Sequence, residues 1–229
     1  MKISTVIFDM DDLMINSHPV NMKGFEAFLQ EHGASMQDPA NPLSRKEEAA
    51  LFGRRRIEVF EFLAEKYGLH GASFEEMDKM TDRVANPIFE EHAEPMPGLF
   101  ELVSLLKREK YRLVLASSAK KEKIGIILKK FRLEKAFDAV VSGVDVKRGK
   151  PDPDIFLKAA ESISAEPKKC VVLEDARNGV MAAKSAGMRC IGVHNQFAFK
   201  RLGIRQDLSG ADLQVNSLEE IDMEKLSKI

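Results

Sequence analysis

The stretch TVIFDMDD, residues 5–12, sets a short apolar run directly before a cluster of acidic side chains. Three later apolar runs are also followed by polar groups: YRLVLA (111–116) by Ser117 and Ser118, AFDAVV (136–141) at a distance by Lys150, and CVVL (170–173) by Glu174 and Asp175. Active sites of open parallel sheets form where strands end at their carboxyl edge. We therefore expect these groups to converge on one crevice suited to a divalent metal and a phosphate.

From residue 96 onward, strand and helix signals alternate along the chain. Apolar spacing predicts helices over 99–108, 121–131, 153–162 and 179–186. Short apolar runs predict buried strands over 113–116, 139–142, 171–173 and 190–193, followed by a last strand over 213–215 and a last helix over 218–226. Repeated βα units of this kind predict the α/β class, as a doubly wound parallel sheet with right-handed crossovers.

Residues 17–92 interrupt that rhythm, because they carry only helical patterns. One such face begins at Met22, a second at Ile57 and a third at Met77, and Pro87 should kink or restart the last helix. We therefore predict a catalytic core formed by residues 1–16 and 93–229, with a helical domain inserted over residues 17–92.

Composition narrows the possible partners and the compartment. The 229 residues carry a net charge of -1, which gives no general bias toward nucleic acid or anionic membranes. No apolar segment approaches the roughly 20 residues needed to cross a bilayer. Asp9 also ends the first apolar stretch too early for a signal peptide. Cys170 and Cys190 have no CxxC partner and suit buried thiols in a reducing cytosol. The expectation is a cytoplasmic protein, monomeric or weakly homo-oligomeric.

The residue types in the four clusters suit phosphoryl transfer. A carboxylate such as Asp9 can attack phosphorus, and Asp11, two residues on, points to the same side of an extended chain, where it could act as acid and base. Glu174 and Asp175 would bring further negative charge that an oxygen-bound Mg²⁺ would offset. Ser117 offers a hydroxyl, and Lys150 an ammonium, to a phosphate. Each cluster taken alone is also compatible with helix capping or an ordinary surface.

Together these residues resemble the four motifs of the haloacid dehalogenase superfamily of phosphohydrolases. FDMDDLMINSHP (8–19) is similar to its opening motif, GKPDPDIF (149–156) to its third and LEDARNGVMAAKSAGM (173–188) to its fourth, while Ser117 matches the second. The resemblance implies Asp9 as nucleophile, Asp11 as general acid and base, and phosphate binding by Ser117, Ser118 and Lys150. It also implies Mg²⁺ held by Asp9, the Asp11 backbone carbonyl and Asp175, with Glu174 nearby, and a small helical cap that closes during transfer.

Several positions depart from the family pattern. Asp12 stands where the family usually has glycine, although aspartate tolerates left-handed backbone better than most residues. Asn16 and His18 replace two acidic residues of the family, so both are candidates for substrate specificity. Arg54 follows Gly53 where relatives place a substrate-facing loop, and it could bind a second anionic group or belong to a solvated helix start.

We interpret the chain as a phosphatase for a small phosphorylated metabolite, such as a sugar phosphate. A β-phosphoglucomutase-like enzyme is an alternative, but Asn21 stands where mutases carry histidine, and Ser117 is followed by a different set of residues. A catalytically silent phosphate-binding homologue is another. A response-regulator receiver domain is disfavoured, because its phosphoacceptor ends the third strand whereas Asp138 precedes the strand predicted at 139–142.

Overall fold

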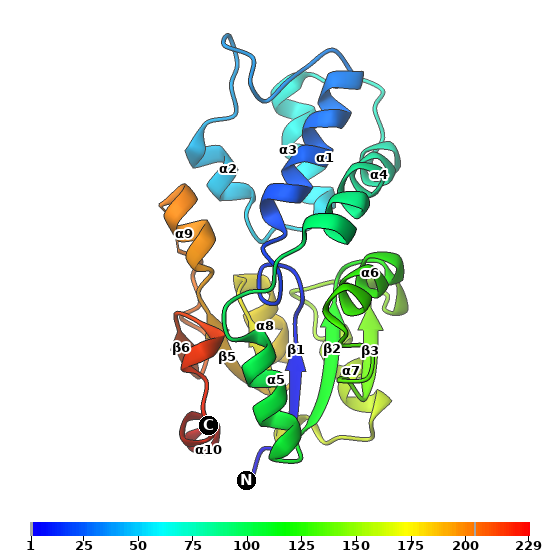
Figure 1. The fold of residues 1–229 in the computed structure, drawn as a ribbon. Coiled ribbons are helices and arrows are strands. Elements are labelled where there is room, and N and C mark those ends of the chain that lie inside the picture. The colour runs from blue at the N-terminus through cyan, green and yellow to red at the C-terminus, as the bar shows by residue number, and fades with distance from the viewer. Residues whose placement is uncertain (1, 204) are drawn as a thin grey trace. The chain divides into compact units, whose positions relative to one another are not determined.

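The computed structural model describes residues 2–203 and 205–229, and the chain forms two compact units (Figure 1). Met1–Asn16 and Glu94–Ile229 make up the first, which we call the sheet unit. Ser17–Ala93 make up the second, which we call the helical unit. The chain therefore leaves the sheet unit shortly after its first strand and returns to it before the remaining strands.

The sheet unit is built on six parallel strands. They are β1 (Thr5–Phe8), β2 (Arg112–Ser117), β3 (Ala139–Ser142), β4 (Cys170–Glu174), β5 (Arg189–Val193) and β6 (Leu213–Val215), in the spatial order β3-β2-β1-β4-β5-β6. The register places Phe8 of β1 beside Leu115 of β2 and Leu173 of β4. Strand order reverses at β1, which is where doubly wound sheets bind ligands. The predicted fold class is confirmed.

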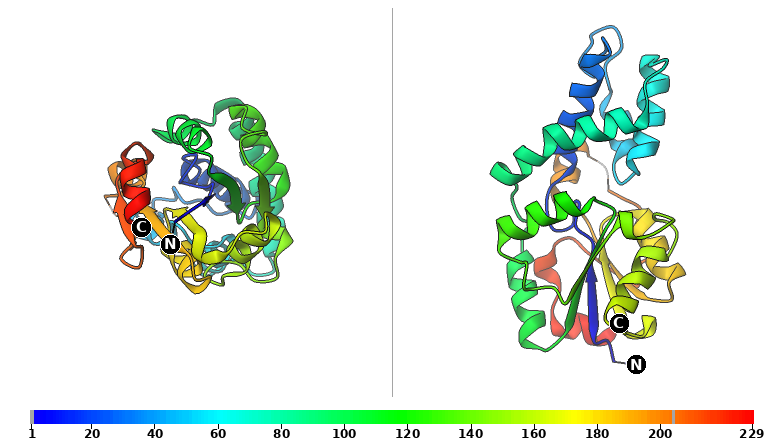
Figure 2. Two further views of the ribbon diagram at one scale, coloured as in Figure 1. Left: turned by 90° about the horizontal axis from the view of Figure 1, so that it is seen from below. Right: turned by 90° about the vertical axis from the view of Figure 1, so that its right-hand side faces the viewer.

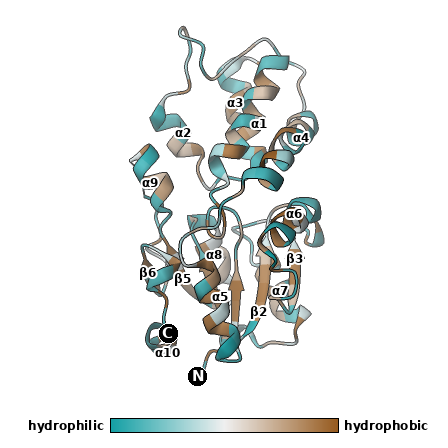
Figure 3. Cartoon of the chain, in the orientation of Figure 1, coloured by the Kyte–Doolittle hydropathy of each residue, from teal (hydrophilic) through white to brown (hydrophobic). Residues whose placement is uncertain are grey.

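Helices lie on both sides of this sheet (Figure 2). They are α5 (Leu99–Arg108), α6 (Lys121–Phe131), α7 (Asp154–Ser162), α8 (Arg177–Ser185), α9 (Gln196–Leu202) and α10 (Met223–Lys228). One buried cluster joins Ile7 and Val172 of the strands to Phe156 of α7 and Val180 of α8. The strands β1 and β2 are accordingly drawn mostly as hydrophobic (Figure 3). Burial of both sheet faces explains their nearly continuous apolar sequence.

The helical unit contains α1 (His18–Glu31), α2 (Arg45–Leu51), α3 (Arg56–Tyr67) and α4 (Phe74–His92). Capping boxes begin α2 at Ser44 and α4 at Ser73, which satisfies exposed backbone N–H groups. The helices α1 and α4 approach so closely at Gly24 that an added Cβ would lie 2.6 Å from Thr81 Cα. A glycine is therefore required at that crossing.

Two expectations about helices are corrected. The helix α4 runs through Pro87 without restarting, because its buried face, from Met77 to Phe89, continues on both sides of the proline, while a kink at Pro87 stays a prediction. The predicted helix over 218–226 is instead a short 3-10 turn, Leu218–Glu220, followed by α10, since Asp222 accepts a hydrogen bond from Lys225 N and caps a new helix. Periodicity also missed the seven-residue helices α2 and α9.

Candidate active site

The first acidic cluster occupies a tight turn after β1. Asp9 continues the strand, since its N–H donates to Leu173 O at 3.1 Å, and its side chain is buried. Met14 N donates to Met10 O at 2.8 Å, which closes the turn. Asp12 adopts a left-handed conformation with φ 62°, so aspartate keeps the geometry that glycine would adopt easily.

A buried lysine joins the first and fourth clusters. Lys150 Nζ donates to Asp9 Oδ1 at 2.6 Å and also to Glu174 Oε1, and all three side chains are less than 10% exposed. The ammonium also lies 4.9 Å from the ring centroid of Phe156. Three residues far apart in sequence therefore meet at the carboxyl edge of β1 and β4, as the strand pattern predicted.

The buried acids here outnumber the nearby buried ammonium. Asp9, Glu174 and Asp175 are at most 5% exposed and interact with Lys150. Asp12, which is 9% exposed, interacts with Asp175. Burial raises the pKa of Asp9 to about 7, with Glu174 adding to the shift and Lys150 opposing it. Burial, followed by the charges of Glu174 and Asp12, holds the pKa of Asp175 well above its usual value. Burial alone would lower the pKa of Lys150, but Asp9 and Glu174 outweigh it and keep this group charged.

This donor set suits a hard cation. Burial is the main cause of the raised carboxyl pKa values, and repulsion between these acids adds to it, so a divalent ion bound by oxygen would offset the negative charge of the cluster. Within residues 2–203 and 205–229, no group of three His, Cys, Asp or Glu side chains is already arranged to hold a metal. Mg²⁺ commonly uses one or two carboxylates together with water, so the residues present fit it without such a group.

The loop after β2 is held from the neighbouring strand. Ser117 is fully buried and its Oγ accepts from Ala119 N at 3.1 Å, while Ser118 is exposed. Ser142 Oγ, at the end of β3, donates to Ala119 O at 2.6 Å. A Cβ on Gly143, the residue directly after β3, would lie 2.5 Å from Ser118 O, so the chain at the end of β3 closely supports this loop.

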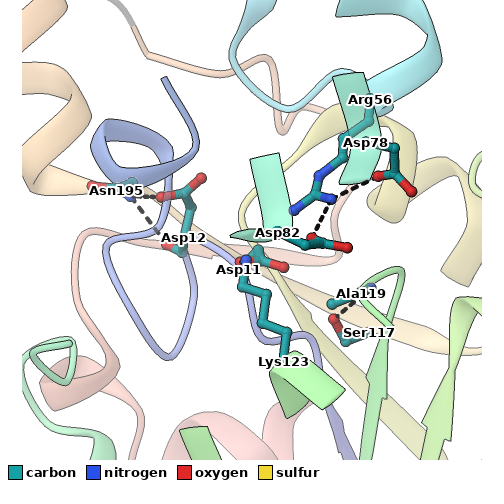
Figure 4. A network of polar contacts seen from close by, with 9 residues as sticks. All are labelled: Asp11, Asp12, Arg56, Asp78, Asp82, Ser117, Ala119, Lys123 and Asn195. Atoms are coloured by element: carbon teal, nitrogen blue, oxygen red, sulfur yellow. Dashed lines mark hydrogen bonds and ion pairs between the residues drawn. The ribbon is translucent and has the colours of Figure 1, made fainter. Parts of the chain in front are cut away.

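Figure 4 shows further polar contacts close to these loops. Lys123 of α6 donates from Nζ to Asp11 Oδ1. Asn195 caps α9 through Ala198 N and donates from Nδ2 to Asp12 O at 3.1 Å. The sequence did not predict the contacts of Lys123, Asn195 and Ser142 with the loops of the site. A signal existed only for Lys123, which lies four residues before the buried Ile127 and so on the apolar face of α6.

The predicted specificity residues are divided between the two units, with Asn16 in the sheet unit and His18 and Arg54 in the helical unit. Asn16 ends the first segment of the sheet unit and is partly exposed. His18 begins α1, with its Nε2 3.4 Å from Glu48 Oε1. Arg54 is exposed, whereas Arg56 is the arginine that joins α3 to α4, donating from Nη1 to aspartates at 2.7 and 2.6 Å. The substrate roles of Asn16, His18 and Arg54 stay predictions.

Buried acids and a lysine gather at the end of β1, where the strand order of the sheet reverses. This fold and this site are typical of phosphohydrolases. The family model for haloacid dehalogenase-like hydrolases matches residues 6–193, and the chain belongs to this family. Relatives named as phosphatases support its class as a phosphoric monoester hydrolase.

No helix in the described parts of the chain is long and apolar enough to span a membrane.

Three relatives illustrate the similarity. The chain is 31% identical over 189 residues to a phosphorylated carbohydrates phosphatase of Thermotoga maritima, covering 82% of this chain and 84% of the relative. It is 30% identical to hexitol phosphatase B of Escherichia coli strain K12, covering 84% of each. The crystal structure of a putative β-phosphoglucomutase from Thermotoga maritima superimposes with a TM-score of 0.70 at 30% identity and covers all of both chains.

Proposed function

We propose that this protein is a Mg²⁺-dependent phosphatase that hydrolyses a small phosphomonoester of the sugar phosphate class through a phosphorylated Asp9. The observation that carries the proposal is the buried contact of Lys150 with both Asp9 and Glu174. A lysine fixed there can hold the nucleophile in place and offset charge on an incoming phosphate. Relatives named for phosphorylated carbohydrates and hexitols support the substrate class.

The proposed reaction has two halves. Asp9 attacks phosphorus, the ester P–O bond breaks, and Asp11 gives its proton to the leaving alcohol oxygen. Water then attacks the phosphorylated Asp9, Asp11 takes a proton from that water, and the P–O bond to Asp9 breaks to release inorganic phosphate. Ser117 and Ser118 would bind the phosphate oxygens. Asp9, Asp175 and the Asp11 carbonyl, with Glu174 close by, would hold Mg²⁺, which when bound neutralises charge on the transferred group.

The test is phosphate release from a panel of sugar phosphates and nucleotides, with Mg²⁺ and with EDTA. We expect release that requires Mg²⁺, favours one sugar phosphate class and is lost in Asp9→Asn. A matched control is Asp152→Asn, since that side chain is 42% exposed and pairs with Arg148 on the surface. No release from any compound, or full activity in Asp9→Asn, would overturn the proposal.

A β-phosphoglucomutase-like activity is the second candidate, because the putative β-phosphoglucomutase described above matches the whole chain. Such an enzyme would interconvert β-glucose 1-phosphate and glucose 6-phosphate without net release of phosphate. The same incubations, analysed for both sugar phosphates, therefore separate the two candidates.

The helical unit is proposed as the cap that closes during phosphoryl transfer.

A further inference from the structure

Lys123 is a buried lysine that bonds to the proposed acid and base. It lies in the first turn of α6 and is 2% exposed. Its Nζ donates to Asp11 Oδ1, whose side chain remains 31% exposed (Figure 4). One end of this pair is therefore enclosed by the sheet unit, while the carboxylate reaches the accessible side.

Packing does not account for a lysine at this position. Lys123 shares the apolar face of α6 with Ile124 and Ile127, where a methionine would fill similar volume without burying a charge. Burying an ammonium is strongly unfavourable unless a partner compensates its charge. Asp11 is such a partner, so the charge of Lys123 is directed at that carboxylate.

The buried lysines Lys123 and Lys150 donate hydrogen bonds to different carboxylates. Lys150, in the loop before α7, contacts Asp9 and Glu174, whereas Lys123 contacts Asp11 from helix α6. An ammonium can only donate hydrogen bonds, so its contact with Asp11 Oδ1 uses that oxygen as an acceptor. In the proposed cycle, Asp11 accepts a proton in the second half, when water attacks the phosphorylated Asp9.

We infer that Lys123 is a positioning residue that orients Asp11 for hydrolysis of the phosphorylated Asp9. The inference rests on the proposed function. In this step the water oxygen bonds to phosphorus, Asp11 takes the water proton, and the electron pair of the broken P–O bond returns to Asp9. The same proton then passes to the leaving alcohol of the next substrate, so Asp11 is regenerated and no co-reactant is needed.

The test follows the phosphorylated enzyme directly, using the whole chain with Mg²⁺. The enzyme reacts with p-nitrophenyl phosphate labelled at phosphorus, unlabelled substrate is added, and the decay of labelled protein is measured by rapid quench. Lys123→Met should slow this decay by about 10- to 100-fold, since small misplacements of a catalytic group cost rates of that order. In Lys123→Met, both kcat and KM should fall, so that kcat/KM stays unchanged within about twofold. A burst of nitrophenolate should precede the steady state, because the phosphorylated enzyme accumulates.

Two variants make the result specific. Lys129→Met removes an exposed lysine from the same helix and should leave the decay rate unchanged. Lys123→Arg keeps the charge and should restore part of the rate. If Lys123→Met does not fold, Lys123→Gln takes its place in the same measurement.

Other outcomes overturn the inference. An unchanged decay rate in folded Lys123→Met would overturn it. An equal loss of kcat and kcat/KM without a burst would overturn it too, because the defect would then lie in the phosphorylation of Asp9 and not in its hydrolysis. Failure of the proposed function is distinguishable, because the wild-type enzyme would then release no phosphate or acquire no label on Asp9.

Discussion

Gly179 allows Glu174 to reach Lys150, and its replacement by alanine tests the whole buried cluster. A Cβ at position 179 would lie 1.7 Å from Glu174 Oε1 and 1.9 Å from its Cδ. Real Cβ contacts are essentially never below 3.0 Å, so the carboxylate must move by more than an ångström. Such a shift breaks its hydrogen bond with Lys150.

The size of the effect follows from three contributions. Overpacking costs about 1–3 kcal/mol, and losing a buried hydrogen bond between charged groups costs about 1.5–3 kcal/mol. Alanine recovers about 0.5–1 kcal/mol because it suits a helix better than glycine. The free energy of unfolding should therefore fall by about 2–5 kcal/mol, which for a protein of this size lowers Tm by roughly 4–20 °C.

The assay is thermal unfolding together with kcat on the substrate found in the panel. Gly125→Ala is the matched control, because Gly125 also lies within a helix, α6, but an added Cβ meets nothing within 4 Å. That variant should be as stable as wild type or more so. Gly179→Ala combined with Glu174→Asp should recover part of the lost stability, since the shorter side chain relieves the clash. Equal Tm and kcat for the two single alanine variants would refute the reasoning.

Three further predictions concern charge and burial. Burial raises the pKa of Asp9 from 3.8 to about 7, so between these pH values the folded protein binds more protons than the unfolded chain, and this group makes stability fall as pH rises. In EDTA, the Tm of Asp9→Asn minus the Tm of wild type should therefore increase from pH 5 to pH 7. Burial raises the pKa of Cys170 to about 11 and that of Cys190 further, so neither thiol should react with a disulfide reagent at pH 8 until guanidinium unfolds the protein. Arg56→Met leaves two aspartates of α4 without this partner and should lower Tm, whereas Arg54→Met, at an exposed position, should not.

The fold could be predicted where the sequence pattern reports burial directly. The strands β1 to β5 lie in apolar runs, and the bounds predicted for α5 and α6 agree with the structure, because their apolar residues repeat at helical spacing. The expectation that Pro87 would restart the last helix of the insert was wrong, whereas a kink there stays a prediction. Pro87 normally disfavours a helix interior, but the buried face of α4 continues past it.

The site could be predicted only as far as strand ends could place it. The register of β1 with β4 brings Asp9 next to Glu174 once both strands belong to one parallel sheet, so proximity followed from topology. The partners of Asp11 and Asp12 come from helices or their caps, whose approach depends on packing that no spacing encodes. Lys123 shows the difficulty: a lysine on an apolar helical face usually reaches solvent with its charged end. The three-dimensional position of Asp11 gives this lysine a buried partner, and replacing Lys123 by methionine would test that pairing.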